Sequence, residues 1–152
     1  MYLKISCLII LIFCFTACSS VPRFTSAGNI IIAPKAETKN YDNYIDSPVL
    51  KTVTGSASFY SDKYNGKVTY SGEVYDMKGL SAAHSVYPMG TIVRITNLLN
   101  KKSIIVPIND RMPNRPDRII DLSMGCAREL NLVNIGIIEV KLEVLEWGTG
   151  KK

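Results

Sequence analysis

The sequence predicts a mainly β domain, because short runs rich in valine and isoleucine alternate with turn residues and only one segment has helical spacing. The strand-like runs cover residues 57–60, 91–97, 103–109 and 139–145. Short β-branched runs bounded by Gly, Pro, Asn or Asp are typical of strands. We therefore expect one domain of ordinary size between Gly55 and Trp147.

The connections between these runs carry their own signals. Residues 97–102 join two strands as a hairpin, in which Asn100 is able to take a positive φ. Ser123 is a typical N-cap for one short helix that ends near Asn131. Cys126 lies inside this helix, where a buried and unreactive thiol is the expected state.

The N-terminal residues 1–17 have the layout of a secretory signal peptide. A positive charge near the start precedes an apolar run over residues 5–15, which ends at small residues. This run is shorter than the roughly 20 apolar residues that a membrane-spanning helix needs. Residues 15–18 resemble a bacterial lipobox, which implies that Cys18 is lipidated and anchors the protein to a membrane. No aspartate follows Cys18, which by analogy favours the outer membrane, facing the periplasm.

Residues 18–54 are rich in Pro, Ser, Thr and Asn and show no lasting periodicity. We expect them to form the lipidated N-terminus and a flexible tether, and residues 148–152 to form a disordered tail. An extra strand over residues 30–33 is the alternative for part of the tether.

Composition argues against several classes of function. Only Cys126 of the four cysteines lies in the predicted domain, so no internal disulfide is expected there. His84 is the single histidine and no residues have the spacing of a metal-ligand set, so we expect neither a metal nor another cofactor. The net charge of +5 arises mostly outside the domain, and no basic stripe with stacking aromatics predicts binding to nucleic acid.

An acid at the end of an apolar run is the first catalytic candidate. The run from Ile104 to Ile108 has the character of a buried strand, and Asp110 follows it where turn residues begin. A carboxylate held by a rigid strand at the loop side of a sheet is suited to general acid catalysis. The alternative is that Asp110 caps a turn or pairs with Arg111.

Five sequence blocks occur in the order in which one known family has them. They are Gly55-Ser56-Ala57-Ser58-Phe59-Tyr60, Gly72-Glu73-Val74-Tyr75-Asp76, Ala82-Ala83-His84 with Pro88-Met89-Gly90-Thr91, Asn109-Asp110-Arg111, and Arg118-Ile119-Ile120-Asp121-Leu122-Ser123. Through these blocks the stretch from Gly55 to Trp147 resembles the rare lipoprotein A family of bacterial envelope proteins. The resemblance implies a six-stranded double-psi β-barrel, related to barwin and the expansins, with an open groove on one side. Met112 stands where the family usually has glycine.

The resemblance also implies roles for individual residues. Asp110 would act as general acid and then as base, with Glu73 as the partner carboxylate or a substrate-orienting base. The candidates for substrate binding or for support of the acids are Asp76, His84, Tyr60 and Arg111. If the His84 imidazole bonds an ionised acid, its pKa should rise above the usual value of about 6.5, and an ordinary buried histidine is the alternative. For Tyr60 the alternatives are sugar stacking and a half-buried strand aromatic.

The implied function is that of an endolytic peptidoglycan lytic transglycosylase. Such an enzyme cleaves the MurNAc-GlcNAc bond of glycan strands, here strands poor in stem peptide, and forms 1,6-anhydro-MurNAc during wall remodelling or daughter-cell separation. The implied partners are the glycan strands, a membrane reached through the lipid on Cys18, and division-site proteins, with the protein itself a monomer. A non-catalytic glycan-binding lipoprotein of the expansin or barwin type is the alternative, and a division-site scaffold is a third possibility.

Overall fold

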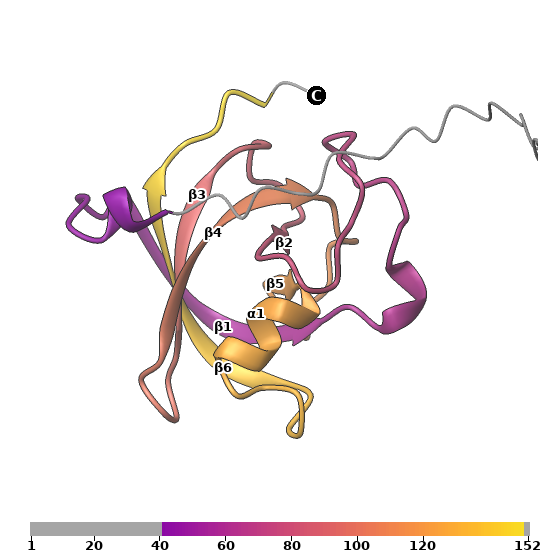
Figure 1. The fold of residues 1–152 in the computed structure, drawn as a ribbon. Coiled ribbons are helices and arrows are strands. Elements are labelled where there is room, and N and C mark those ends of the chain that lie inside the picture. Colours follow the sequence, from indigo (N-terminus) through magenta and orange to yellow (C-terminus); the bar gives the residue numbers. More distant parts are fainter. Residues whose placement is uncertain (1–40, 151–152) are drawn as a thin grey trace, which may run out of the picture. The chain divides into compact units, whose positions relative to one another are not determined.

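Six strands close into a barrel in the computed structural model, which describes residues 41–150. The predicted signal peptide, Cys18 and the tether up to residue 40 lie outside the described residues. The strands are β1 (Lys51–Phe59), β2 (Ala82–Ala83), β3 (Ile92–Asn97), β4 (Ser103–Asp110), β5 (Ile120–Leu122) and β6 (Ile138–Glu146). They follow one another around the barrel in the order β1-β5-β2-β4-β3-β6 (Figure 1). The predicted mainly β, six-stranded barrel is therefore confirmed.

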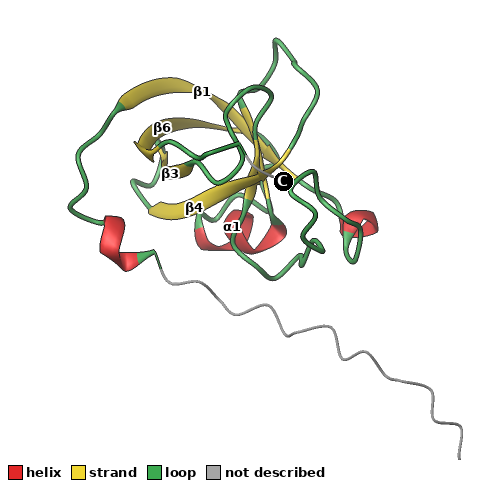
Figure 2. Cartoon of the chain, turned by 90° about the horizontal axis from the view of Figure 1, so that it is seen from above, coloured by secondary structure: helices red, strands yellow, loops and turns green. Residues whose placement is uncertain are grey.

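Helical structure is confined to short segments of the described chain, and long loops join most of the strands (Figure 2). The segments are η1 (Asp42–Tyr44), η2 (Asp62–Tyr64) and α1 (Met124–Glu129). The Ser123 hydroxyl accepts a hydrogen bond from the Cys126 N–H at 3.2 Å, which confirms the predicted N-cap of α1. Within residues 41–150, no helix is long and apolar enough to cross a membrane.

Each predicted strand-like run corresponds to a strand, but β2 and β5 have no counterpart in the prediction. They contain only two and three residues and depend on their neighbours. β2 pairs in parallel with β4 and antiparallel with β5, and β5 pairs in parallel with β1. Parallel partners lie far apart in the sequence, so a local pattern does not reveal them.

The predicted hairpin between β3 and β4 is present, but its positive φ lies elsewhere. Lys101 adopts a φ of 63°, whereas the prediction gave this conformation to Asn100. Asn100 has another role, because its side-chain amide donates to the Leu130 carbonyl at 3.0 Å and its oxygen accepts from the Lys102 N–H at 3.0 Å. The asparagine thus ties the hairpin to the end of α1, and the lysine takes the turn.

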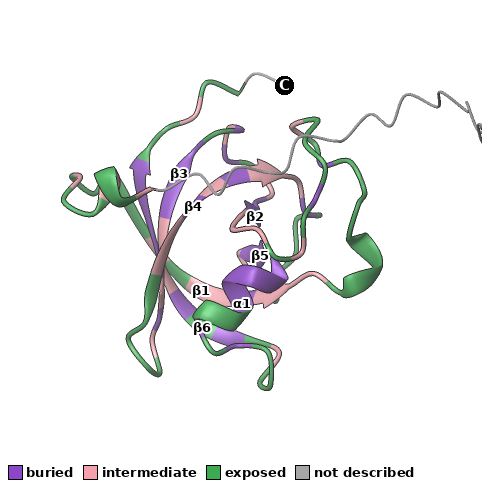
Figure 3. Ribbon diagram, viewed as in Figure 1, coloured by how far each residue is buried: buried purple, intermediate pink, exposed green. Residues whose placement is uncertain are grey.

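The hydrophobic core fills the interior of the barrel (Figure 3). Alternate residues of the long strands face inward, as expected for strands with one buried face. Fully buried examples are Val93, Ile95, Val106, Ile108, Val140 and Leu142. Cys126 of α1 is fully buried in the same core, and burial raises the pKa of its thiol to about 11, which supports the predicted unreactive state.

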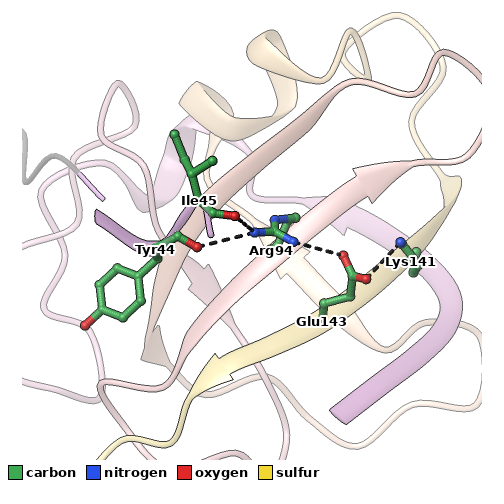
Figure 4. Close-up of polar contacts among 5 residues, drawn as sticks. All are labelled: Tyr44, Ile45, Arg94, Lys141 and Glu143. Carbon is green, nitrogen blue, oxygen red and sulfur yellow. Dashed lines mark hydrogen bonds and ion pairs between the residues drawn. The ribbon is translucent and has the colours of Figure 1, made fainter. Parts of the chain in front are cut away.

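The barrel contacts chain that precedes Gly55, where the sequence analysis places the tether. β1 begins at Lys51 and pairs with β6 from its first residue, because Thr52 and Val53 suit a strand. Arg94 of β3 donates to the carbonyl oxygens of Tyr44, at 3.3 Å, and of Ile45 (Figure 4). These contacts fix the segment that enters β1 against the face of β3 and β6.

The Arg94 contact is part of a charged network on the same face (Figure 4). The Glu143 carboxylate lies 3.8 Å from Arg94 and 2.8 Å from Lys141.

At the other end of the chain, the Gly148 N–H donates to the Thr91 hydroxyl at 3.1 Å, so the predicted tail contacts the barrel as far as it is described.

Candidate active site

A groove of about 540 Å³ opens beside the ends of β1 and β4. Most of its lining comes from two stretches of chain, residues 58–69 and 110–121. Two carboxylates contribute to this lining, Asp110 at the end of β4 and Asp121 in β5. The groove therefore has the pair of acids that glycan cleavage generally uses.

Asp110 and Asp121 lie at the same level of the sheet, because both pair with Ala83 of β2. Ser58 of β1 continues the row as the partner of Asp121 on its other side. Directly paired residues share one face of a sheet, and neighbouring strands are about 4.8 Å apart. The Cα atoms of the two acids are thus roughly 10 Å apart, with the smallest side chain of the row between them.

A register shift in β4 determines which residue takes this position. Ala82 pairs with Ile108, but Ala83 pairs with Asp110, so Asn109 is an extra residue in the ladder. In a regular strand Asn109 would lie beside Ala83, and the side chain of Asp110 would turn toward the core. A bulge of this kind re-aims the side chain that follows it. The acid enters the groove because the strand contains one additional residue.

Hydrogen bonds fix both oxygens of Asp110. Its Oδ1 accepts the backbone N–H groups of Tyr70 and Arg111, each at 2.8 Å. Its Oδ2 accepts the hydroxyl of Tyr60 at 3.0 Å. Since Oδ1 already has two donors, Oδ2 is the oxygen that is placed to carry and transfer a proton.

Tyr60 lies next to both acids. Burial raises the pKa of its hydroxyl, and the charges of Asp110 and Asp121 and the bond to Asp110 raise it further. The hydroxyl therefore stays protonated and remains a donor across the pH range in which the protein would work. The ring of Tyr60 packs edge-on against the ring of Tyr75, with ring centres 5.2 Å apart. It also packs at a tilt against the ring of Tyr64, with ring centres 5.5 Å apart. The structure thus gives Tyr60 a polar contact with Asp110, in line with its place among the candidates for support of the acids.

Asp121 is buried, with 7% of its surface exposed, and its charge is partnered. The Arg118 Nε lies 2.7 Å from its Oδ1, an ion-pair distance, although the geometry is not that of a hydrogen bond. The Ser58 hydroxyl donates to the same oxygen. These contacts leave Oδ2 of Asp121 without a hydrogen bond from residues 41–150.

Glu73 and Asp76, both predicted for the groove, lie outside its lining. Glu73 accepts a hydrogen bond from the side-chain amide of Asn109 at 2.8 Å, and so holds the extra residue beside Asp110. Asp76 accepts the backbone N–H of Lys78, two residues on, at 2.9 Å, a contact typical of an aspartate in a turn. The carboxylates that line the groove are Asp110 and Asp121.

His84 does not bond an acid through its imidazole, and the expected rise of its pKa is wrong. The ring Nδ1 accepts the N–H groups of Val86 at 3.2 Å and Tyr87 at 3.1 Å, and the ring stacks on Tyr87. Burial, followed by the charges of Arg111 and Lys51, lowers the pKa to about 4. Only the backbone of His84 reaches the acid's strand, because its N–H donates to the Asp110 carbonyl at 3.2 Å.

Arg111 supports the same loop from the groove side. Its Nη1 donates to the carbonyl oxygens of His84, at 3.1 Å, and of Tyr87. Its guanidinium lies over the ring of Tyr70, 5.2 Å from the centre. Arg111 thus lines the groove with its charge already engaged by two carbonyls and a ring.

Among residues 41–150, no group of His, Cys, Asp and Glu is arranged to hold a metal ion.

Residues 52–142 match the model of a protein family described as lytic transglycolase. The chain belongs to this family. Its family relatives include the endolytic peptidoglycan transglycosylase RlpA of Neisseria meningitidis, which is 47% identical over 97 residues, or 64% of this chain and 41% of the relative. RlpA of Pseudomonas aeruginosa is 45% identical over 94 residues, or 62% of this chain and 28% of the relative. The chain thus spans less than half the length of these curated relatives, and the predicted resemblance to the rare lipoprotein A family is confirmed.

Two solved structures have a barrel similar to that of this chain. An expansin of Clavibacter michiganensis has a TM-score of 0.52 at 22% identity, covering 66% of this chain and 53% of that one. Streptomyces papain inhibitor has a TM-score of 0.51 at 22% identity, covering 66% of this chain and all of that one. At this identity the likeness shows the fold alone.

Asp121 lines the groove but is not among the site residues predicted from the sequence. It belongs to the quoted block Arg118 to Ser123, but no role was assigned to it there. A signal was present, because the single acid alternates with Ile120 and Leu122, which are both fully buried. In a strand this pattern places the acid on the outer face.

Proposed function

We propose that this member of the lytic transglycolase family is an endolytic peptidoglycan lytic transglycosylase that cleaves MurNAc-GlcNAc bonds and forms 1,6-anhydro-MurNAc ends. The observation that carries the proposal is the groove with two carboxylates, Asp110 and Asp121, at one level of the sheet. The names of the relatives that are 45 to 47% identical to this chain support it.

In the proposed reaction Asp110 gives and then takes one proton. Oδ2 of the protonated acid donates to the glycosidic oxygen, and the bond from that oxygen to C1 breaks. The C6 hydroxyl of the same muramic acid attacks C1, and its proton passes to the Asp110 carboxylate. A C–O bond is broken, another is formed inside the sugar, and no water is consumed. Asp110 is protonated again at the end of the cycle.

The neighbours of Asp110 divide the remaining tasks. Asp121, as the second carboxylate, stabilises the positive charge that develops at C1, because an oxocarbenium-like centre is attracted to a nearby anion. Tyr60 orients the Asp110 carboxyl group through its 3.0 Å hydrogen bond to Oδ2. Glu73 is a positioning residue in this proposal, and acts through Asn109.

The proposed setting is the bacterial cell envelope. The lipobox-like residues 15–18 support a signal peptide over residues 1–17 and a lipid anchor at Cys18, with the outer membrane facing the periplasm as the site. Residues that follow would tether a monomeric barrel within reach of glycan strands and division-site proteins. In cells, Cys18→Ala should abolish palmitate labelling, and labelling that persists in the variant would contradict the anchor.

The activity is tested with purified protein and purified glycan strands, with mass spectrometry of the products. Asp110→Asn should abolish anhydro-MurNAc formation, and Asp121→Asn should reduce it by about 100-fold or more, in the range of general acid and electrostatic contributions. Asp46→Asn is the matched control, because Asp46 is exposed and lies outside the groove lining. Glu73→Gln should cost less than either groove acid.

The outcome also separates this proposal from a glycan-binding module. Binding of strands by the wild-type protein without any cleavage product would favour the non-catalytic alternative. Wild-type rates in Asp110→Asn would refute the assignment of the acid. If Glu73→Gln were more damaging than Asp121→Asn, the partner carboxylate would be Glu73 and the groove acids would have been assigned wrongly.

A further inference from the structure

The groove lining includes cations that have no acidic partner among residues 41–150. Five basic residues line the groove, namely Lys63, Lys67, Arg111, Arg115 and Arg118. Arg118 is paired with Asp117 and Asp121, and Arg111 is engaged by backbone carbonyls and the Tyr70 ring. In the described part of the chain, neither of the two lysines nor Arg115 forms an ion pair with a carboxylate.

The two lysines lie over the same aromatic ring, that of Tyr64. The Lys63 and Lys67 ammonium groups lie 5.2 Å and 5.1 Å from the ring centre of Tyr64. The turn that carries them is fixed by backbone bonds, in which the Lys67 N–H donates to the Tyr64 carbonyl at 3.1 Å and the Gly66 N–H to the Tyr75 carbonyl at 2.9 Å. Both ammonium groups therefore lie within about 5 Å of the Tyr64 ring centre, and both residues are exposed.

This cationic pair lies beside the acids that carry the proposed chemistry. Tyr64 packs on Tyr60, with ring centres 5.5 Å apart, and Tyr60 donates to Asp110. A glycan whose bond is cleaved at Asp110 would therefore extend past Tyr64 and the two lysines. A groove for a neutral polysaccharide has no use for unpaired cations there, whereas an anionic group on the strand would supply the missing partner.

We propose that Lys63 and Lys67, with Arg115 on the facing stretch, form a carboxylate-binding subsite that selects glycan strands bearing a free carboxylate near the cleaved bond. The proposal rests on the proposed function, because it concerns how the same groove recognises its strand. Two carboxylates are available in peptidoglycan. One is the lactyl carboxylate of muramic acid, free where the stem peptide has been removed, and the other belongs to the stem peptide itself.

The test compares three preparations of the same strands with the full protein. The first has free lactyl carboxylates, the second has these carboxylates converted to methylamides, and the third retains its stem peptides. The variant is K63Q/K67Q, which removes both charges and keeps the length of the side chains. The matched control is K101Q/K102Q, which removes two exposed charges from the β3–β4 hairpin, outside the groove lining.

For the free-carboxylate strands, KM should rise roughly 3- to 30-fold in K63Q/K67Q, as expected for two exposed ion pairs, with kcat within about twofold. The methylamide strands should show the raised KM already with the wild type and no further change in the variant. An effect confined to strands with stem peptides would identify the peptide as the source of the carboxylate. The control variant should behave as the wild type, and added salt should reduce the difference.

An unchanged KM in K63Q/K67Q on every preparation would overturn the subsite. An equal rise on free and methylamide strands would also overturn it, because the lysines would then recognise something other than a carboxylate. If the wild type releases no anhydro product, the proposed function fails, and binding of the same strands to Asp110→Asn decides the subsite separately. Binding that depends on both the carboxylate and the two lysines would uphold it.

Discussion

The pKa of His84 makes the stability of the barrel depend on pH in a defined window. Its Nδ1 accepts two backbone N–H groups, from Val86 and Tyr87, so a proton on that nitrogen would break both bonds. Burial and the nearby cations hold the pKa at about 4, below the 6.5 of an exposed histidine. Because the folded state disfavours the charged form, this contribution is fully present above pH 6.5. It is lost as the pH falls from 6.5 to 4.

The size of the effect follows from the two pKa values. At about 1.4 kcal/mol per pKa unit, a change from 6.5 to about 4 corresponds to at most about 3 kcal/mol. That is a large part of the 5 to 15 kcal/mol or so by which a domain is usually stable. Aspartate and glutamate side chains also titrate in this pH range. The contribution of His84 to stability must therefore be separated from theirs.

The variant His84→Asn separates the contribution of His84 from that of the carboxyl groups. The Asn Oδ1 can accept the same N–H groups, and the amide does not titrate. Urea unfolding at several pH values between 7.5 and 4 should show the wild type losing up to about 3 kcal/mol relative to the variant. Since His84 is the only histidine, its NMR titration is unambiguous and should have a midpoint near pH 4. Parallel stability curves, or a midpoint at or above 6.5, would refute the reasoning.

Two further predictions concern residues at and behind the groove. Tyr60→Phe removes the donor to Asp110 without changing the ring, so kcat for anhydro-product formation should fall about 10- to 100-fold, as expected for a hydrogen bond to a charged group, while the thermal unfolding midpoint changes little. A kcat within twofold of the wild type would show that Tyr60 does not position the acid. The thiol of Cys126, with its pKa near 11 and no exposure, should resist iodoacetamide at pH 8 in the folded protein and react in urea, as peptide mapping would reveal.

The barrel was predictable from the sequence where its strands carry a local pattern. The run at residues 103–109 and the cap at Ser123 are both visible because each depends on neighbours in the chain. β2 and β5 depend on distant partners. Ala82 and Ala83 form a strand only because Leu122 and Ile108 lie on either side. The prediction that the barrel closes therefore rested on the family resemblance and not on periodicity.

The site was predictable as a set of residues but not as a geometry. Asp110 could be found because it ends an apolar run. The contact of Glu73 with Asn109 could not, because it depends on an extra residue in the ladder of β4 that alters the alternation of the strand. His84 was misjudged for a related reason. Its imidazole turns toward the backbone of its own loop, and the sequence contains no sign of that direction.

The two acids share a groove only if the residue between them is small, and this gives the last prediction. Ala83 pairs with both acids, is fully buried, and is absent from the core cluster that includes Ala82. Ala83→Val suits a strand by propensity but adds two methyl groups between Asp110 and Asp121. Overpacking of this kind costs about 1 to 3 kcal/mol, which urea unfolding measures.

The same two methyl groups should displace the carboxylates, so kcat should fall by 100-fold or so for a misplacement of about 1 Å. Ala83→Ser, which adds one small polar atom, is the matched control and should retain most of the activity. If Ala83→Val were destabilised but fully active, the space between the acids would not matter, and the pairing of Asp110 and Asp121 across β2 would be a feature of the fold rather than of the chemistry.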